Sequence, residues 1–310
     1  MSLTSLIRSS DSETKRFFDK HFPNVTEAVK LINQDLAAKK LHDCLPKKSP
    51  GHVYGWVGTA FDYRARYYLK ITPYKQLMAY SGGKIFENNQ TFGKNLDAWL
   101  RRTQKPKKKL TAVQERNICL LTLLLAKLEV LGRAYMVESP VEVLGEVHYP
   151  IVKEAIAQPT IAKTLKILAG KYDPNVVKDL AALSRIFRKN LVAWNVRASV
   201  LNPLFAGSAD VGGADADLIL GSVLVEIKCK KRAIGRNDIF QLIGYKLLDY
   251  RNWYGIDCLG IYFGRYGILE YWPIQKMFKG LGCSISSISK LREKFRRAIE
   301  KDMRFINGYL

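Results

Sequence analysis

The sequence is poor in the residues that build thiolate and zinc sites. Its 310 residues include five cysteines and four histidines. The cysteines form no C-x-x-C pair, and the histidines do not have the spacing of a zinc motif. Cys119 and Cys229 lie within apolar patterns, so we expect them to be small core residues.

Long uninterrupted hydrophobic runs are also missing. The longest apolar run, ICLLTLLLAKLEVL, is interrupted by Lys127 and Glu129 and is too short to span a bilayer. The first residues, MSLTSLIRSS, are followed by charged residues, whereas a signal peptide continues with an apolar stretch. We therefore expect a cytoplasmic protein with no membrane partner.

Acidic residues are scarce relative to basic ones. Fifty Lys and Arg against 28 Asp and Glu give a formal net charge of +22. A basic excess of this size is most often found in proteins that bind nucleic acid, and an anionic membrane surface is the weaker alternative. The 47% apolar content is ample for a hydrophobic core.

Some of the acids stand on what read as two adjoining strands. The stretches ADLIL and VLVEIK are short apolar runs separated by Gly221 and Ser222. Glycine at the first of two loop positions is typical of a type II′ hairpin turn. In the register that this turn sets, Asp217 faces Glu226.

The same register places charged side chains on one face of the hairpin. Glu226, Lys228 and Lys230 share a face because side chains alternate along a strand, and Asp215 is opposite Lys228. Opposed carboxylates repel each other, but they suit a divalent cation, since Mg²⁺ is commonly held by one or two carboxylates with water and phosphate. The alternative is a solvated strand face whose lysines neutralise the acids. We favour the metal site.

These residues also carry a family resemblance. Asp217, a gap of eight residues and then Glu226-Ile227-Lys228 resemble the signature of the PD-(D/E)XK nucleases. The resemblance implies that Asp217 and Glu226 hold Mg²⁺ or Mn²⁺, with the Ile227 carbonyl as a further ligand and Asp215 as a weaker one. It also implies that Lys228 orients the attacking water or helps to deprotonate it.

A helix downstream extends the resemblance to the RecB-like branch of that superfamily. The stretch DIFQLIGYKLLDY places Gln241 and Tyr245 on one helical face, in the Q-x-x-x-Y pattern of this branch. Both residues then belong to the catalytic set, although Tyr245 could instead pack beneath the sheet. Some members hold an iron–sulfur cluster through one upstream and three clustered downstream cysteines. This sequence lacks that arrangement, so we expect no cluster.

An upstream stretch, VGTAFDYRARYYL, is similar to the first motif of the same branch. Asp62 takes the position of a histidine in that motif. An aspartate can bind a hard cation, but it is equally typical of an acidic first helical turn. Arg64 and Arg66 would then contact phosphate or be solvated.

Basic residues follow the E-x-K strand directly, and we expect four of them to contact nucleic acid: Lys230, Lys231, Arg232 and Arg236. A basic connector, RRTQKPKKK, and a basic C-terminal helix add to this charge. We therefore expect a metal-dependent deoxyribonuclease with DNA as its partner. The alternative is a nucleic-acid-binding module that keeps the fold without cleaving.

The remaining patterns predict an α/β protein. Helical spacing is expected over residues 12–45, 60–80, 112–137, 175–194, 237–251 and 286–307, with strands at CLGIYFG and ILEYWPI. The resemblance implies a restriction-endonuclease-like αβββαβ core. We expect a mostly helical region over residues 1–194, packed on a nuclease core over residues 195–310.

Overall fold

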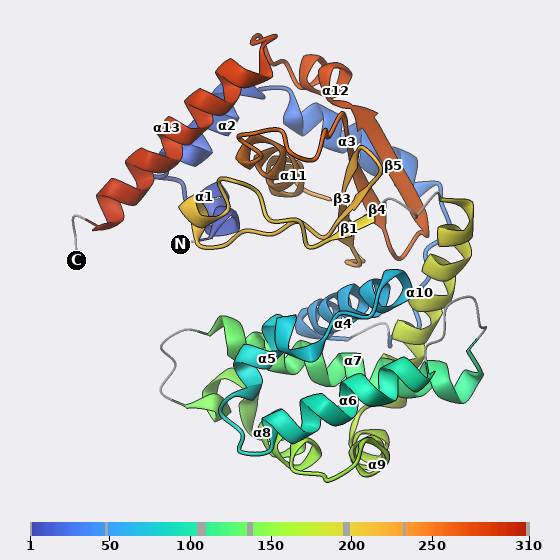
Figure 1. The fold of residues 1–310 in the computed structure, drawn as a ribbon. Helices are drawn as coiled ribbons and strands as arrows, with labels where there is room; N and C mark the ends of the chain where they lie inside the picture. Colours follow the sequence, from blue (N-terminus) through green and yellow to red (C-terminus); the bar gives the residue numbers. More distant parts are fainter. Residues whose placement is uncertain are drawn as a thin grey trace. The chain divides into compact units, whose positions relative to one another are not determined.

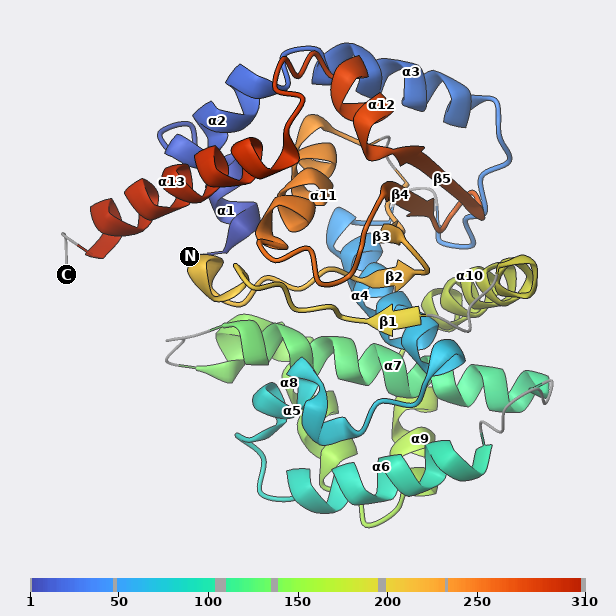
Figure 2. The same ribbon diagram turned by 45° about the horizontal axis from the view of Figure 1, so that its top comes forward.

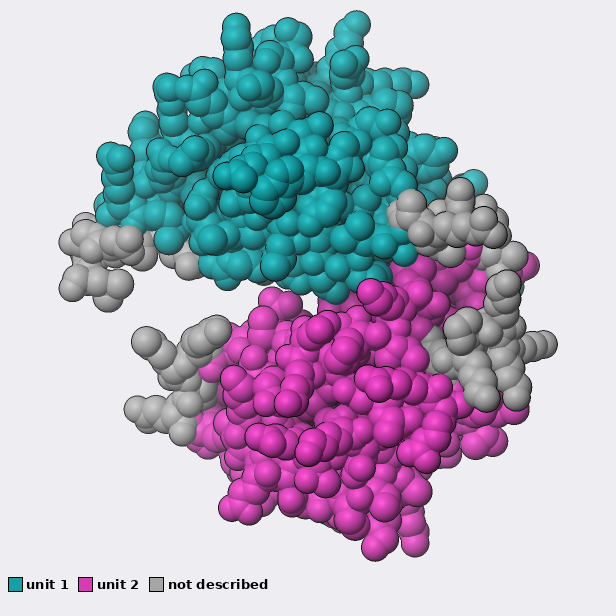
Figure 3. Space-filling view, in the orientation of Figure 1, with its two compact units in different colours: residues 1–41, 194–228, 232–310 teal, residues 42–193, 229–231 magenta. Residues whose placement is uncertain are grey.

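The computed structural model describes residues 2–46, 49–103, 110–134, 139–194, 199–231 and 234–307. The chain divides into two compact units, coloured separately in Figure 3. The first unit comprises residues 1–41, 194–228 and 232–310, and the second comprises residues 42–193 and 229–231. The division between the units at residue 194 lies close to the expected boundary at 195. The first 41 residues, however, belong to the same unit as the C-terminal part of the chain.

A mixed sheet organises the first unit (Figure 1), and in the described part of the chain it has five strands in sequence order: β1 (Ser199–Leu201), β2 (Leu218–Leu220), β3 (Val223–Lys228), β4 (Cys258–Phe263) and β5 (Ile268–Pro273). β1, β2 and β3 are antiparallel, and β5 is antiparallel to β4. β3 and β4 are parallel, which requires the crossover that α11 (Arg236–Leu248) provides. The expected α/β class is confirmed.

The hairpin between β2 and β3 has the predicted register. Leu220 pairs with Val223, and Leu218 pairs with Val225. Gly221 has a φ of +59°, whereas Ser222 is not among the residues with positive φ. A type II′ turn needs positive φ only at its first central residue, so the glycine fits the turn that the sequence predicts.

The helix α11 lies between the sheet and other helices of the first unit (Figures 1 and 2). These helices are α1 (Leu3–Arg8), α2 (Glu13–His21), α3 (Val25–Ala37), α12 (Ile274–Gly280) and α13 (Ile288–Asn307). The ring of Phe18 in α2 stacks on Phe240 in α11 with centroids 4.7 Å apart. Contacts with the sheet on one side and with helices on the other explain why every residue of α11 from Ile239 to Leu248 except Gln241 is buried.

The N-terminal helices join the C-terminal helix through a helix cap. The carboxylate of Asp302 in α13 accepts hydrogen bonds from the backbone N–H groups of Glu13 at 2.7 Å and Thr14 at 2.9 Å. These donors belong to the first turn of α2, where no intrahelical acceptor exists and where the helix dipole favours a negative charge. Asp302 therefore fixes the first 41 residues to the same unit as the sheet.

The second unit is helical in the part of the chain that the structure describes. Its helices are α4 (Gly51–Leu69), α5 (Met78–Gly83), α6 (Asn89–Thr103), α7 (Ala112–Arg133), α8 (Pro140–Ile156), α9 (Ile161–Lys171) and α10 (Pro174–Ala193), with a 3₁₀ turn at Tyr74–Gln76. α7 is the buried centre, and α4, α5, α8, α9 and α10 all contact it. Within the described ranges, no helix combines the length and the hydropathy needed to cross a membrane.

A glycine contact sets the distance between α5 and α7. A Cβ atom placed on Gly82 would lie 1.8 Å from the carbonyl oxygen of Leu128, and one placed on Gly132 would lie 2.7 Å from the carbonyl oxygen of Met78. Neither obstacle is a side chain that could rotate away. The two helices therefore pack backbone against backbone at these positions.

Candidate functional site

A chain of polar contacts joins the end of β3 to one face of α11. The Lys228 ammonium donates to Glu226 Oε1 at 2.8 Å and to Gln241 Oε1 at 3.0 Å. Gln241 Nε2 lies 2.7 Å from the Tyr245 hydroxyl and donates to it. The structure thus brings together the E-x-K strand and the Q-x-x-x-Y helix, as the sequence predicts.

Asp217 enters the same group from the β2 side. Its Oδ2 accepts a hydrogen bond from the backbone N–H of Ile227 at 2.7 Å. This contact places Asp217 beside the outer end of β3, one step beyond the Leu218–Val225 pair. The predicted neighbourhood of Asp217 and Glu226 follows from that register.

Tyr245 lies within the electrostatic influence of three acids. Burial raises the pKa of its phenol, and the charges of three nearby carboxylates raise that pKa further. Those carboxylates belong to Glu226, Asp217 and Asp215. Tyr245 is buried and its hydroxyl is bonded to Gln241, which agrees with packing beneath the sheet as well as with a polar role.

Asp215 does not face Lys228 as expected. It forms an isolated antiparallel bridge with Leu204, and its Oδ2 accepts from Asn202 Nδ2 at 2.9 Å. The ladder with β3 stops at Leu218, and the preceding residues pair toward the β1 side. Asp215 therefore remains near the acids without being the cross-strand partner of Lys228.

Carboxylates surround the Lys228 ammonium. Burial alone lowers the pKa of this lysine, but the charges of Glu226, Asp238 and Asp217 outweigh burial and raise it above its ordinary value. Lys228 is therefore protonated at neutral pH. In this state it can orient a water or stabilise negative charge, but it cannot accept a proton.

The sequence analysis missed one acid of this group, Asp238. Its Oδ1 lies 3.6 Å from Lys228 Nζ, and its Oδ2 accepts from the backbone N–H of Gly235 at 2.7 Å. Asp238 is the third residue of α11, and an acid at this position commonly caps the start of a helix. That signal predicts the cap, but the contact with Lys228 depends on how α11 packs on β3.

The charged face of β3 is covered rather than solvated. Glu226 is only 4% exposed, and Leu224 on the same face belongs to the core cluster that includes α11 residues. The interpretation of Glu226 as part of a solvated strand face is therefore wrong. An acid is buried at a cost of free energy unless it is paired, and here it is paired with Lys228.

The acids can be compared with what a divalent cation needs. No group of three or more His, Cys, Asp or Glu side chains forms a metal cage within the residues that the structure describes. Mg²⁺, however, is commonly held by one or two carboxylates with waters and substrate phosphate. Asp217 accepts from the backbone N–H of Ile227, the residue that follows Glu226 on β3, so the two carboxylates come from neighbouring positions and supply two hard oxygen donors of the kind that suits this cation.

The four basic residues expected to contact nucleic acid fall into different settings. Arg236 forms an ion pair with Asp19 in the first unit. Lys230 and Lys231 belong to the second unit, where Lys231 Nζ lies 3.0 Å from Asp43 Oδ2. Arg232 lies outside the described residues. Two of the four therefore have acidic partners already, which sequence order alone does not show.

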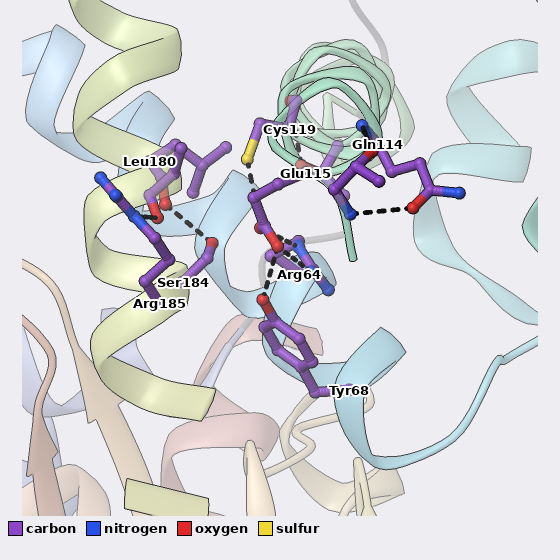
Figure 4. Close-up of polar contacts among 11 residues, drawn as sticks. Arg64, Tyr68, Gln114, Glu115, Cys119, Leu180, Ser184 and Arg185 are labelled. Carbon is purple, nitrogen blue, oxygen red and sulfur yellow. Dashed lines mark hydrogen bonds and ion pairs between the residues drawn. The ribbon is translucent and has the colours of Figure 1, made fainter. Parts of the chain in front are cut away.

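The upstream motif lies on α4 in the second unit. Asp62 pairs there with Arg66, four residues on. Arg64 is fully buried and neither solvated nor open to a phosphate: its guanidinium donates to both Glu115 oxygens, each at 2.9 Å (Figure 4). Tyr68 also donates to Glu115, at 2.8 Å. Both expected roles of Arg64 are therefore wrong.

No protein-family model, no curated protein and no solved structure matches this chain. The resemblance to the PD-(D/E)XK nucleases therefore rests on the quoted motifs alone.

Proposed function

We propose that the protein is a Mg²⁺- or Mn²⁺-dependent nuclease of the PD-(D/E)XK type, acting on phosphodiester bonds in DNA. The observation that supports this most directly is the polar cluster of five side chains: Asp217, Glu226, Lys228, Gln241 and Tyr245. The two motifs are separated in sequence, and chance matches would have no reason to meet in one network.

The order of elements around the cluster supports the same proposal. Three antiparallel strands, a crossover helix and a parallel fourth strand follow one another as in the βββαβ part of the core that the resemblance implies. Asp217 directly precedes the second strand, Glu226 and Lys228 lie on the third, and Gln241 and Tyr245 lie on the helix. The formal net charge of +22 suits a polyanionic substrate.

The side chains divide the work of hydrolysis as follows. Asp217 and Glu226 would hold the cation, which when bound would activate a water and offset phosphate charge. Lys228, protonated at neutral pH, orients that water and stabilises the charge that develops in the transition state. Gln241 accepts from Lys228 and donates to Tyr245, so it fixes the direction of the lysine side chain.

The test is the substitution Glu226→Gln, which keeps the size and one acceptor oxygen but removes the charge. We expect Mn²⁺-dependent cleavage of labelled DNA to fall by at least about a thousandfold, since a metal ligand is lost. We also expect the rise in melting temperature that Mn²⁺ gives the parent protein to disappear. Activity gels and thermal melts with and without Mn²⁺ measure both.

Glu270→Gln is the matched control, because Glu270 is an exposed strand glutamate on β5. Glu270→Gln removes the same charge and should leave both the cleavage rate and the Mn²⁺-dependent rise in melting temperature unchanged. Parent protein that neither cleaves DNA or RNA nor responds to Mn²⁺ would contradict the nuclease proposal. If this inactive parent protein still bound DNA, the alternative of a non-cleaving nucleic-acid-binding module would be supported instead.

The ion pair with Lys228 determines how Glu226→Gln affects the metal-free protein. The like-charge contact with Asp217 would by itself make the substitution stabilising by up to about 1 kcal/mol. Glu226 is, however, also the nearest anion to a buried lysine, at 2.8 Å. Removing one partner of a buried pair costs more than that repulsion, so we expect a net loss of stability.

Tyr245→Phe tests the helix half of the cluster. The phenol is buried and receives a hydrogen bond from Gln241, so its removal leaves the Gln241 amide without that acceptor. We expect cleavage to fall by about ten- to a hundredfold with the melting temperature little changed, because Lys228 loses its fixed orientation. Single-turnover rates at saturating Mn²⁺ give the measurement. Unchanged rates would make Gln241 and Tyr245 ordinary packing residues.

A further inference from the structure

A cavity of about 600 Å³ opens at the other end of the parallel strand pair. Cys258, which lines it, pairs with Val223 at the start of β3, whereas Lys228 pairs with Phe263 at the opposite end. The two ends are the first and last of six paired residues, so five steps of about 3.3 Å separate them by roughly 16 Å. The cavity is therefore a different place from the polar cluster, although both use α11.

Two cations from different helices converge in this cavity on one neutral acceptor. Lys246 Nζ of α11 donates to Asn252 Oδ1 at 2.7 Å, and Arg292 of α13 donates to the same oxygen at 3.1 Å. Lys246 is only 1% exposed. The Nε of Arg292 is buried and has no hydrogen-bond partner. One amide oxygen cannot saturate the donors of both groups, since an ammonium has three and a guanidinium five.

The electrostatics of the cavity favour an added negative charge. Burial, followed by the charge of Arg292, lowers the pKa of Lys246 to about 8, and the opposing effects of Asp249 and Asp257 do not restore it. Burial also lowers the pKa of Arg292. Asp249 accepts from the backbone N–H of Trp253, and Asp257 is bonded to Ser222. Asp257 also lines the cavity, and the second oxygen of Asp249 is buried without a hydrogen-bond partner. Among the described residues, however, no ion pair joins either carboxylate to Lys246 or Arg292, so the two cations are not neutralised by direct contact.

The rest of the lining suits an organic ligand rather than a bare ion. Ile256, Ile274 and Ile288 give it an apolar wall, and Gln275 adds an amide beside Asn252. Small-molecule sites typically have volumes of about 300–1,000 Å³, with apolar walls and few polar groups. This cavity has both properties.

We propose that the cavity binds the phosphate group of a mononucleotide-sized ligand, with Lys246 and Arg292 as the phosphate-binding pair. A phosphate monoester carries up to two negative charges and three acceptor oxygens, which matches two cations and their spare donors. The Arg292 fork and the Lys246 ammonium hold the phosphate, and the isoleucine wall contacts the nucleoside. The site neither uses the metal-binding acids nor requires the protein to be a nuclease.

The experiment is a titration of the whole chain with deoxyadenosine monophosphate, deoxyadenosine and inorganic phosphate, in EDTA and at constant ionic strength. Isothermal titration calorimetry gives the affinities. We expect the monophosphate to bind at least about tenfold more tightly than either fragment, because it fills both halves of the cavity. Arg292→Gln and Lys246→Met should each weaken it by about ten- to a hundredfold, the equivalent of one charged hydrogen bond.

Lys290→Gln is the matched control, since it removes a cation from the same helix at an exposed position outside the lining. It should leave the affinity unchanged. An equal loss in Lys290→Gln would reduce the binding to general charge attraction, and the absence of binding up to millimolar monophosphate would overturn the proposal. Arg292 is only partly buried, so we expect Arg292→Gln to fold. This variant tests the site even if Lys246→Met fails to fold.

A second pair of variants separates this site from the proposed nuclease site. Glu226→Gln should bind the monophosphate like the parent protein, because Glu226 lies toward the opposite end of β3. If Glu226→Gln abolished the binding, the ligand would occupy the polar cluster, and the cavity would be the wrong location. Loss of cleavage without loss of binding would leave this proposal intact.

Discussion

Substituting Lys228 by methionine is expected to abolish DNA cleavage while metal binding is retained. The ammonium donates a hydrogen bond to Glu226 at 2.8 Å. Its loss removes the group that orients water and offsets transition-state charge, so we expect the cleavage rate to fall by about a thousandfold or more. The acids remain, so Mn²⁺ should still raise the melting temperature.

The same variant should make the metal-free protein less stable. Lys228 offsets the charges of Glu226, Asp238 and Asp217, and breaking a buried pair from one side costs about 3–5 kcal/mol. A cation bound between the acids would replace part of the lost charge. The rise in melting temperature on adding Mn²⁺ should therefore be larger in Lys228→Met than in the parent protein.

Lys279→Met is the control, because Lys279 is an exposed lysine at the end of α12. It should cleave normally and melt like the parent protein. A Lys228→Met protein that cleaved at the parental rate would show that the E-x-K resemblance is fortuitous. Loss of both cleavage and the Mn²⁺ response would mean that Lys228 supports the fold of the site rather than its chemistry.

The direction of the Lys228 pKa shift also fixes a pH expectation. The folded-state pKa is raised, so this lysine contributes stability that is fully present below its unfolded-state pKa and is lost only as pH rises through the higher folded value. Both lie far above neutrality. Between pH 6 and 9, Lys228 should therefore add no slope to the stability of the metal-free protein, which denaturant unfolding at several pH values measures.

The hairpin could be predicted because its information is local. Gly221 and Ser222 set the turn, the turn sets the register, and the register places Asp217 beside Glu226. The Gln–Tyr pair is equally local, since four residues make one helical turn. The packing of α11 on β3 brings Gln241 to Lys228. The family resemblance predicted this proximity, whereas helical periodicity alone does not.

Contacts between residues far apart in the sequence could not be predicted from the sequence. Asp215 lies beyond the β2–β3 ladder, which stops at Leu218, and it bridges Leu204 and contacts Asn202 instead. The sequence around Asp215 contains no signal for these contacts. Lys231 and Arg236 met acids that lie far away in the sequence, Asp43 and Asp19. A basic run shows only that charge is present, whereas tertiary folding decides which charges are already paired.

Helix boundaries failed for local reasons that can be named. The expected helix over residues 12–45 breaks after His21, because the proline at position 23 disfavours helical backbone at Phe22. The helix expected over residues 60–80 begins at Gly51 and ends at Leu69. Gly55 and Gly58 in its first turns are poor helix formers, so tertiary packing must override their propensity.

Replacing Arg64 by methionine is expected to destabilise the protein by about 3–5 kcal/mol. Arg64 is fully buried and donates two hydrogen bonds to Glu115, and its guanidinium also lies 3.5 Å from the centroid of the Tyr68 ring. Methionine fills much of the volume but leaves the Glu115 charge buried without its cation, which is the costly half of breaking such a pair. Denaturant unfolding monitored by circular dichroism measures the loss.

The double substitution Arg64→Met with Glu115→Leu separates the cost of an orphaned charge from the value of the pair. It removes both charges at once, and buried pairs replaced by apolar residues of similar size are often no less stable than the original. We therefore expect the double variant to regain most of the stability that Arg64→Met loses. If it stays as unstable as the single variant, the packing of the guanidinium on Tyr68 contributes more than its charge. A phosphate-binding Arg64 predicts the opposite pattern, with weaker DNA binding and unchanged stability, and the closed contact with Glu115 argues against it.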